Sequence, residues 1–341
     1  MNKILMISHF YHPHVGGVEK HLNKIINILI KADYKVDLIT LKYETKLKEI
    51  DKINSNFTIY RIPTNNKRYL GLVSIWLWFL KNLSLLKSAD IIHIHDVFIW
   101  FLPTRFLLPF KKVFMTFHGY ESYPLSKKAI FYRRLASWFT QGNICVGNFI
   151  PKWYGIKPTI VTYGAVDKSN INDKLKISYD AVFVGRLDEQ TGITTYADAV
   201  DLIREKYPNF KFLILGDGKF KKQLQKKYIC KGFVRNPEIF LNQSKFAFVS
   251  RYLAILEAFI AKRLLFAVYD NPIKRDYLRL TPFKDLMIIC KDSKELTEEV
   301  VYYLNNTYEA KEKINKAYKW ANDQTWEKMV ENYEQLWFSK K

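Results

Sequence analysis

Short apolar runs alternate with amphipathic segments along most of the chain. In the first half these runs are rich in β-branched residues, which predicts strands at 3–8, 35–41, 57–62, 90–95, 113–118, 143–146 and 159–163. Between the first two, residues 18–31 carry leucine and isoleucine at helical spacing, which predicts an amphipathic helix. Apolar strands joined by helical crossovers predict a parallel sheet that is covered on both faces.

The same rhythm starts again after a polar stretch at 167–179. Further strands are predicted at 180–185, 212–216, 246–250, 264–269 and 286–290. A chain of 341 residues exceeds what one hydrophobic core usually supports. We therefore expect an α/β protein with two Rossmann-like domains, 1–166 and 180–324, joined by a linker at 167–179. Their sheets are expected to face each other across a cleft.

The last segment, 318–338, places large side chains on one stripe: Trp320, Trp326, Met329, Tyr333 and Trp337. This spacing predicts a helix or a helix pair with an apolar face to bury. We expect its final part, 325–341, to pack back toward the first domain.

Composition is typical of a globular protein, with 48% hydrophobic and 26% charged residues. The three cysteines, Cys145, Cys230 and Cys290, are far apart, which argues against disulfides and a cysteine zinc site and fits a reducing cytoplasm. The chain does not start like a secretion signal. The longest apolar stretch, 69–86, is interrupted by polar residues, so no membrane span is expected.

The net charge of +21 predicts an anionic partner such as nucleic acid, anionic lipid or a phosphorylated substrate. Residues 101–165 hold nine Lys/Arg and one acid, a balance of 9 − 1 = +8. Aromatic and basic residues also mix at 69–81, 98–102 and 127–139, as in helices that lie on anionic membranes; a core position for the aromatics fits equally well. No dedicated nucleic-acid module is present.

Candidate chemistry lies in the loops after the predicted strands, where open parallel sheets bind ligands. Gly16 and Gly17 form a strand-to-helix turn that lets phosphate approach the backbone, although it is not the G-x-G-x-x-G pattern of dinucleotide sites. Gly185 and Arg186 follow the first strand of the second series, where a guanidinium is suited to a diphosphate.

Two histidines, His95 and His118, also end strands, and each can bond a sugar hydroxyl, carry protons near neutral pH or serve a structural role. His118 is the stronger candidate because the following glycine opens space for a ligand. Glu257 is expected to open a helix and accept two ribose hydroxyls, with the free amides of Leu253, Ala254 and Ile255 facing phosphate. The alternative is a glutamate that only complements the helix dipole.

No D-x-D, H-E-x-x-H, G-x-S-x-G or G-x-x-x-x-G-K-[ST] motif occurs, so a metal clamp for a nucleotide sugar, a metalloprotease, a serine hydrolase and a Walker ATPase are all disfavoured.

Taken in order, these motifs resemble glycosyltransferase family 4, which consists of retaining enzymes with the GT-B fold. The matching segments cover nearly the whole chain: Gly16-Gly17, 90–95, His118, 164–167, 185–187, 216–218, 256–258 and 326–327. The resemblance implies transfer of a sugar from a UDP- or GDP-sugar to a glycan or lipid-linked acceptor, with no metal or other cofactor. Such an enzyme would work in the cytoplasm, in peripheral contact with the inner face of an anionic membrane.

The resemblance also implies roles for residues. Arg186 would bind the donor diphosphate and Glu257 the ribose, Gly16 and Gly17 would approach the donor phosphate and acceptor, and His118 would touch the transferred sugar. The leaving diphosphate would help to deprotonate the acceptor on the same face, so that the site's task is to stabilise charge on the departing phosphate.

Two positions depart from the family pattern. Thr191, counted among the donor-binding residues, stands where the family has a diphosphate-binding lysine, and Lys219 is a candidate substitute. Val249 stands where an earlier glutamate is expected, and the segment 250–256 looks shortened. These departures keep open a weak or inactive GT-B protein that binds nucleotide or a partner. A GT-B sugar-nucleotide epimerase is a third possibility that no motif favours.

Overall fold

The computed structural model describes residues 2–63, 68–168 and 176–339, with the backbone alone at 68–70. The chain divides into two compact units, one of Met1–Thr162 with Trp326–Lys341 and one of Tyr163–Thr325. The expected first domain ended at 166, so residues 163–166 fall instead to the second unit. Residues 169–175 of the expected linker lie outside the described residues. The C-terminal segment belongs to the first unit.

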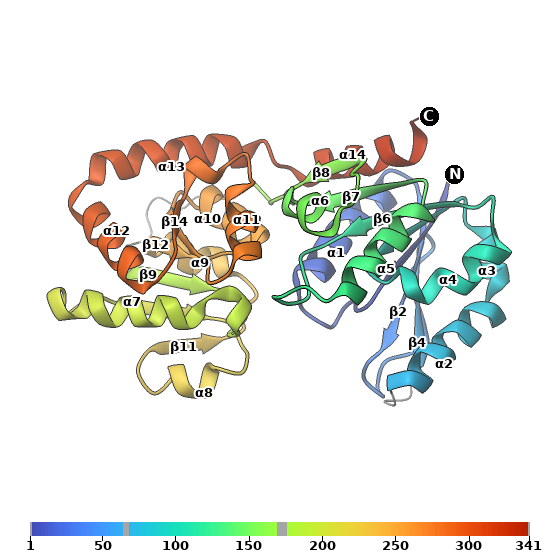
Figure 1. Ribbon diagram of the computed structural model, residues 1–341, viewed down its shortest axis with the longest axis horizontal. Coiled ribbons are helices and arrows are strands. Elements are labelled where there is room, and N and C mark those ends of the chain that lie inside the picture. Colours follow the sequence, from blue (N-terminus) through green and yellow to red (C-terminus); the bar gives the residue numbers. More distant parts are fainter. Residues whose placement is uncertain (1, 64–67, 169–175, 340–341) are drawn as a thin grey trace. The chain divides into compact units, whose positions relative to one another are not determined.

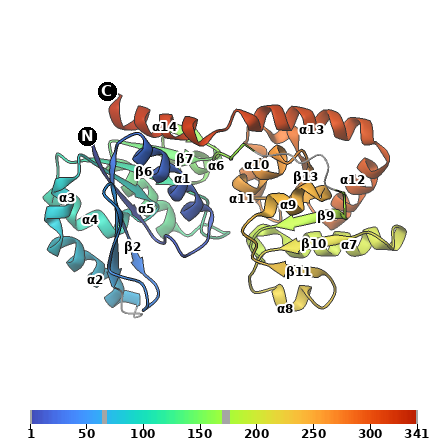
Figure 2. The same cartoon turned by 180° about the vertical axis from the view of Figure 1, so that it is seen from behind.

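The first unit contains an eight-stranded sheet in the order β3-β4-β2-β1-β5-β6-β7-β8 (Figures 1 and 2). Its strands are β1 Lys3–Ser8, β2 Lys35–Lys42, β3 Ile50–Asn54, β4 Phe57–Pro63, β5 Ile91–His95, β6 Lys112–Phe117, β7 Gly142–Val146 and β8 Ile160–Thr162. All pair in parallel except β3, which is antiparallel to β4. The expectation of a purely parallel sheet is wrong at this edge. β3 is mostly exposed, and it therefore lacks the apolar run that marks the other strands.

Seven helices accompany this sheet in the described residues: α1 Gly17–Lys31, α2 Arg68–Lys81, α3 Leu83–Ser88, α4 Phe98–Leu107, α5 Lys127–Trp138, α6 Phe149–Tyr154 and α14 Trp326–Phe338. Helix α1 buries the apolar stripe that predicted it and packs against α14, while α2, α4, α5 and α6 contact one another in a row. In α14, Trp326, Met329, Tyr333 and Trp337 are all buried, so these four members of the predicted stripe form part of the core of this unit, whereas Trp320 belongs to the second unit.

The second unit contains a six-stranded parallel sheet in the order β11-β10-β9-β12-β13-β14. Its strands are β9 Tyr179–Val184, β10 Phe212–Leu215, β11 Ile229–Gly232, β12 Ser244–Phe248, β13 Leu264–Val268 and β14 Ile288–Cys290. Its helices are α7 Ile193–Lys206, α8 Lys221–Leu224, α9 Pro237–Asn242, α10 Tyr252–Ile260, α11 Pro272–Arg279, α12 Ser293–Asn305 and α13 Thr307–Asn322, with short 3-10 turns at Glu189–Thr191 and Lys284–Leu286. Among the strands that the structure describes in this unit, β11 alone was not predicted; it is a half-exposed edge strand.

Each sheet grows first to one side of its central strand and then to the other. The change of direction falls between β1 and β5 in the first unit and between β9 and β12 in the second. Loops that leave the carboxyl ends of strands at such a point diverge and create a natural ligand site. The fold therefore directs attention to residues 95–97 and the neighbouring loop at 118–121 in one unit, and to 185–191 and 249–251 in the other.

Candidate functional site

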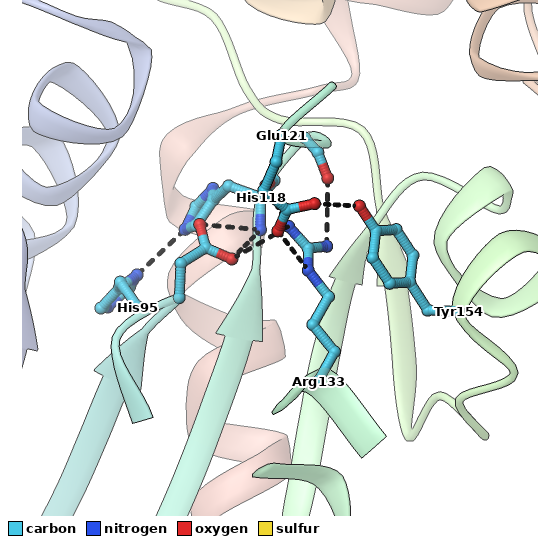
Figure 3. A network of polar contacts seen from close by, with 7 residues as sticks. His95, His118, Glu121, Arg133 and Tyr154 are labelled. Carbon is cyan, nitrogen blue, oxygen red and sulfur yellow. Dashed lines mark hydrogen bonds and ion pairs between the residues drawn. The ribbon is translucent and has the colours of Figure 1, made fainter. Parts of the chain in front are cut away.

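In the first unit, the ring of His95 at the end of β5 contacts the ring of His118, which follows β6 (Figure 3). His95 Nδ1 and His118 Nε2 lie 3.0 Å apart. The other nitrogen of His95, Nε2, is buried without a hydrogen-bond partner among the described residues. A buried acceptor without a partner costs less than a buried N–H without one, so we place the proton of His95 on Nδ1. His118 then accepts at Nε2 and keeps its proton on Nδ1 for donation.

Burial lowers the pKa of both histidines well below the ordinary value, and neighbouring imidazoles act in the same direction. Both rings are therefore neutral at pH 7. Of the roles open from the sequence, hydrogen bonding by a neutral imidazole is favoured over proton transfer near neutrality.

A second set of side chains clamps the loop that carries His118 (Figure 3). The carboxylate of Asp96 accepts the backbone N–H of His118 at 3.0 and 3.2 Å. The guanidinium of Arg133 donates to the carbonyl oxygens of His118 and Gly119 and pairs with Glu121 at 2.9 Å. Tyr154 adds a hydrogen bond from its hydroxyl to Glu121. This network was not predicted from the sequence, because no sequence motif links Arg133 on α5 to the residues that it contacts.

Asp96 itself is unusual in backbone and charge. Its φ of 61° lies in the left-handed region, which non-glycine residues occupy mainly where surrounding structure holds them. Burial raises the pKa of its carboxyl to about 7, and the opposing effects of Arg133 and the His118 amide are smaller. About a third of this side chain is exposed to solvent, however, which limits the effect of burial on its charge.

Gly119 leaves open space beside His118, as the sequence predicted. Its φ is +54°, and a Cβ built on it would meet no atom within 4 Å. A ligand can therefore approach the loop at this point.

Beneath the pair, a chain of buried hydrogen bonds joins α14 to the sheet and α1. Trp337 Nε1 donates to His93 Nδ1 at 2.9 Å, which places the proton of His93 on Nε2 and directs it to Thr116 Oγ1 at 2.7 Å. The chain continues through Tyr333 to His21 Nε2. It fixes the layer on which the His95–His118 pair rests.

Gly16 and Gly17 begin α1: Gly16 is the extended residue before the helix and Gly17 is its first residue. The carboxylate of Glu19, in the first turn, lies against Gly16 and bonds to His14 Nδ1 at 2.7 Å. This helix N-terminus thus already faces an internal carboxylate, with which a phosphate would have to compete.

In the second unit, Arg186 stands on the loop that follows β9, with 66% of its side chain exposed. Its Nε pairs with Asp188 Oδ2 at 3.2 Å, and its Nη2 donates to Gln190 Oε1 at 3.2 Å. The 216–218 segment holds this loop through close backbone contacts. A Cβ at Gly216 would collide with the Gly185 carbonyl oxygen, and one at Gly218 would lie 2.6 Å from that of Leu187.

Thr191 belongs to the framework of the same loop. It is buried, and its hydroxyl lies 2.7 Å from the carbonyl oxygen of Arg186 and 2.8 Å from that of Asp188. The hydroxyl therefore closes the turn and brings no charge to the loop. Lys219, the candidate substitute, reaches the same loop through an ion pair with Glu189.

The next candidates lie on α10. Leu253 and Ala254 are half-buried in its first turn, and Ile255 is fully buried. The expectation of a free amide is wrong at Ile255, because this amide donates to the Arg251 carbonyl oxygen at 2.9 Å. The expectation that Glu257 opens the helix is wrong: the helix begins at Tyr252, and its first turn holds no acid. Glu257 lies beyond that turn, so the alternative of a first-turn glutamate that only complements the dipole falls away.

The connection from β12 to α10 is short. Only Val249, Ser250 and Arg251 separate the strand from the helix, and Val249 is fully buried. This turn therefore has no room for the longer loop that the family pattern implies. It does hold Arg251, which contacts Gln190, and it lies over the buried Lys274. Neither basic residue was singled out from the sequence, although Arg251 follows a strand as Arg186 does.

Two further features bear on cofactors. Within 2–63, 68–168 and 176–339, no three His, Cys, Asp or Glu side chains gather in a group that could hold a metal ion. Cys145, Cys230 and Cys290 are all free cysteines.

Comparison with known proteins adds a second line of argument. Residues 15–167 match the family described as Glycosyltransferase Family 4, and residues 178–306 match that described as Glycosyl transferases group 1. A Campylobacter jejuni α-1,4-N-acetyl-D-galactosaminyltransferase, named for a diNAcBac-PP-undecaprenol-linked substrate, is 22% identical over 90% of this chain and 91% of its own length.

One component of the human phosphatidylinositol N-acetylglucosaminyltransferase is 25% identical over 64% of this chain, but the match spans only 48% of the human protein. Among solved structures, sucrose-phosphate synthase from Thermosynechococcus elongatus superposes with a TM-score of 0.76 over 98% of both chains, at 13% identity. WaaG, a glycosyltransferase involved in lipopolysaccharide biosynthesis, superposes with a TM-score of 0.70 over 99% of this chain and all of WaaG, at 11% identity. At such identities these structures establish the fold.

Proposed function

Because the chain belongs to the family 4-type glycosyltransferases with the GT-B fold, we propose that it transfers a sugar from a nucleotide diphosphate sugar to a glycan or lipid-linked acceptor. The donor is a UDP- or GDP-sugar, and the configuration at the sugar carbon is retained. The observation that carries the proposal is the position of Arg186 at the carboxyl edge of the second sheet, next to its change of direction.

In the proposed reaction the bond between the sugar C1 and the diphosphate oxygen breaks, and a bond from C1 to the acceptor oxygen forms on the same face. The acceptor proton passes to an oxygen of the departing diphosphate. Negative charge grows on that diphosphate as the bond breaks, so a guanidinium that donates hydrogen bonds to it lowers the barrier. Arg186 fills this role, and Glu257 accepts hydrogen bonds from the ribose hydroxyls.

His118 of the first unit is proposed to contact the transferred sugar. A neutral imidazole with its proton on Nδ1 can donate to a sugar hydroxyl, and Gly119 leaves room for the ligand beside it. The bond from His95 fixes the tautomer, and the clamp formed by Asp96 and Arg133 fixes the loop. Hydroxyl recognition needs this precision, because a misplaced donor loses most of its hydrogen-bond energy.

Peripheral membrane contact is proposed for the outer face of α5. Lys127, Phe131, Arg134 and Trp138 follow one another along it at helical spacing, and all four are at least partly exposed, with Trp138 at 72%. Exposed aromatic rings beside basic groups suit the interface of an anionic bilayer. The segment 98–102 differs, because Phe98, Trp100 and Phe101 are buried in the core. No helix in the described part of the chain is long and apolar enough to cross a bilayer.

The transfer reaction is tested with a panel of UDP- and GDP-sugars, following release of nucleoside diphosphate with and without lipid-linked or glycan acceptors. Release with at least one donor, unaffected by EDTA, is expected. Strict dependence on a divalent ion would contradict the role given to Arg186.

A second candidate is a GT-B protein that binds nucleotide without turnover. Val249 and Thr191 favour it, because a carboxylate and an ammonium of the family pattern are both absent at these positions. Ordinary nucleotide binding without release from any donor in the panel would support this candidate over the first.

The membrane proposal predicts that the protein sediments with anionic liposomes at low salt and is released at high salt. The double variant Phe131→Ser, Trp138→Ser should sediment poorly. Tyr308→Ser serves as the control, because Tyr308 is an aromatic residue of the second unit with 74% exposure. Failure of the unaltered protein to sediment at low salt would overturn the proposal.

A further inference from the structure

Arg251 lies beside Arg186 in the second unit, although the two come from different strand ends. Its Nη2 donates to Gln190 Oε1 at 2.6 Å, and Arg186 Nη2 approaches the same oxygen at 3.2 Å. One neutral amide oxygen therefore receives hydrogen bonds from two guanidinium groups. Gln190 can orient both groups but cannot neutralise either, whereas an anion with several oxygens could bond to both at once.

The backbone that carries Arg251 is held from three sides. The Ser250 hydroxyl donates to the Thr191 carbonyl oxygen at 2.9 Å, which ties this turn to the Arg186 loop. The ammonium of Lys274 donates to the Ser250 carbonyl oxygen at 2.5 Å. The Tyr252 amide donates to the Tyr277 hydroxyl at 2.9 Å. The two guanidinium groups are therefore placed before any ligand arrives, which lowers the entropic cost of binding.

The neighbouring groups add little net positive charge of their own. Lys274 is only 1% exposed. Its burial, and to a smaller extent the charge of Arg251, lowers its pKa well below the ordinary value. Helix α10 begins directly after Arg251 and has no acidic residue in its first turn. Asp188 balances Arg186, and Glu189 balances Lys219. Arg186 and Arg251 themselves follow β9 and β12, the two strands between which the second sheet changes direction.

We propose that Arg251 is a donor-binding residue, and that with Arg186 it grips the two phosphoryl groups of the nucleoside diphosphate. The inference rests on the proposed function and adds to it the residue that supplies the second positive charge. Thr191 does not provide this charge, because it is a neutral residue that closes the loop. The short turn after β12 is then part of the site, because it carries Arg251 directly from the strand into the helix.

The test is calorimetric titration of the full chain with UDP, GDP, UMP and GMP. Arg251→Gln should lower affinity for the preferred nucleoside diphosphate about 10- to 100-fold, as expected for a lost hydrogen bond to a charged group. Affinity for the matching monophosphate should change about threefold or less, since a single phosphoryl group needs only one of the two guanidinium groups. Arg251→Lys should recover part of the loss, because it restores the charge without the planar fork.

Lys206→Gln is the matched control: it removes one positive charge from the C-terminal end of α7, at the opposite edge of the same sheet. It should leave both affinities unchanged. Unchanged diphosphate affinity in Arg251→Gln, or an equal loss for mono- and diphosphate, would overturn the inference. If Arg186→Gln alone weakens diphosphate binding, the proposed function stands and only the role of Arg251 fails. If the unaltered protein binds none of the four nucleotides, both fail. Should Arg251→Gln not fold, Arg251→Lys decides, with a selective loss of diphosphate affinity expected.

Discussion

The places where the two sheets change direction carry different chemistry. In the first unit, His95 and His118 are neutral, and Arg133 is compensated by Asp96 and Glu121. In the second unit, two guanidinium groups converge on one amide oxygen. The same topology thus places two neutral imidazoles in one unit and two guanidinium groups in the other, of which Arg186 is paired with Asp188.

The histidine content sharpens this contrast. All seven histidines lie between positions 9 and 118, so the second unit has none. Four of them, His21, His93, His95 and His118, are joined by ring contacts, and burial lowers the pKa of each. A buried hydrogen-bonded layer of this kind fixes ring positions but ties the stability of the unit to pH.

The largest expected effect is selective acid unfolding of the first unit. Burial lowers the pKa of His21 to about 4 and that of His93 to about 3, against 6.5 in the unfolded chain. Between these values the unfolded chain binds more protons, so stability falls as pH falls below 6.5. At pH 5 each of these two histidines should cost about 2 kcal/mol relative to pH 7.

Hydrogen exchange at pH 5 and pH 7, corrected for the intrinsic rate, would report each unit separately. The α1 and α14 amides should lose protection at pH 5, while those of α7 and α12 in the second unit should change little. Equal losses in both units would contradict a histidine origin.

Arg186→Ala should have the next largest effect, because it removes a charged donor from the second unit. Affinity for the nucleoside diphosphate should fall by about 2–3 kcal/mol, and the fold should be unaffected, since this side chain is largely exposed. His118→Ala should instead slow transfer with little change in nucleotide affinity. Titration with UDP and GDP measures the first, and a transfer assay the second. An Arg186→Ala variant that binds diphosphate normally would remove the contrast between the units.

Glu257→Gln should act on the other end of the nucleotide. Loss of a charged acceptor for ribose hydroxyls should cost about 1 kcal/mol. The loss should be the same for UDP and UMP, or GDP and GMP, because both members of each pair carry the ribose. Glu298→Gln, an exposed change on α12, is the control. A loss confined to the diphosphate would place Glu257 near the phosphates and away from the ribose.

Much of this organisation follows from local patterns in the sequence. Strands such as β1 and β13 were predicted because their side chains are mostly buried and form nearly continuous apolar runs. β3 and β11 were missed because edge strands need no such run. The resemblance to family 4 is confirmed by the matches over 15–167 and 178–306. It did not depend on any single motif.

The site was only partly predictable. His118 and Arg186 were singled out as candidates because each follows a strand, a position that the sequence reveals. The convergence of Arg186 and Arg251 on Gln190 was not found, because it depends on two turns that are distant in the chain. The position of Glu257 within α10 was also predicted wrongly, because the sequence did not reveal where the helix begins. The helix starts at Tyr252, directly after the short turn from β12.

The smallest predicted effect concerns Asp96, and it opposes that of the histidines. Burial raises the pKa of its carboxyl to about 7, above the ordinary 3.8, so between these values the folded protein holds a proton that the unfolded chain releases. This contribution to stability is complete at low pH and is lost as pH rises toward 7. Because a third of the side chain is exposed, solvent screening keeps the effect modest.

As the pH rises from 5 to 8, Asp96 should lower the free energy of unfolding of the unaltered protein, while the histidines raise it. Asp96→Asn should remove the first effect and leave the second. Melting temperatures at four pH values would measure it, with Asp323→Asn, an exposed aspartate of the second unit, as the control. The variant should gain slightly more stability than the unaltered protein as pH rises through 7. Asparagine still offers an oxygen to the His118 amide, so the loop itself should persist. If the two proteins melt in parallel at every pH, Asp96 keeps its charge throughout, and the neutral character assigned to the first unit is confined to its histidines.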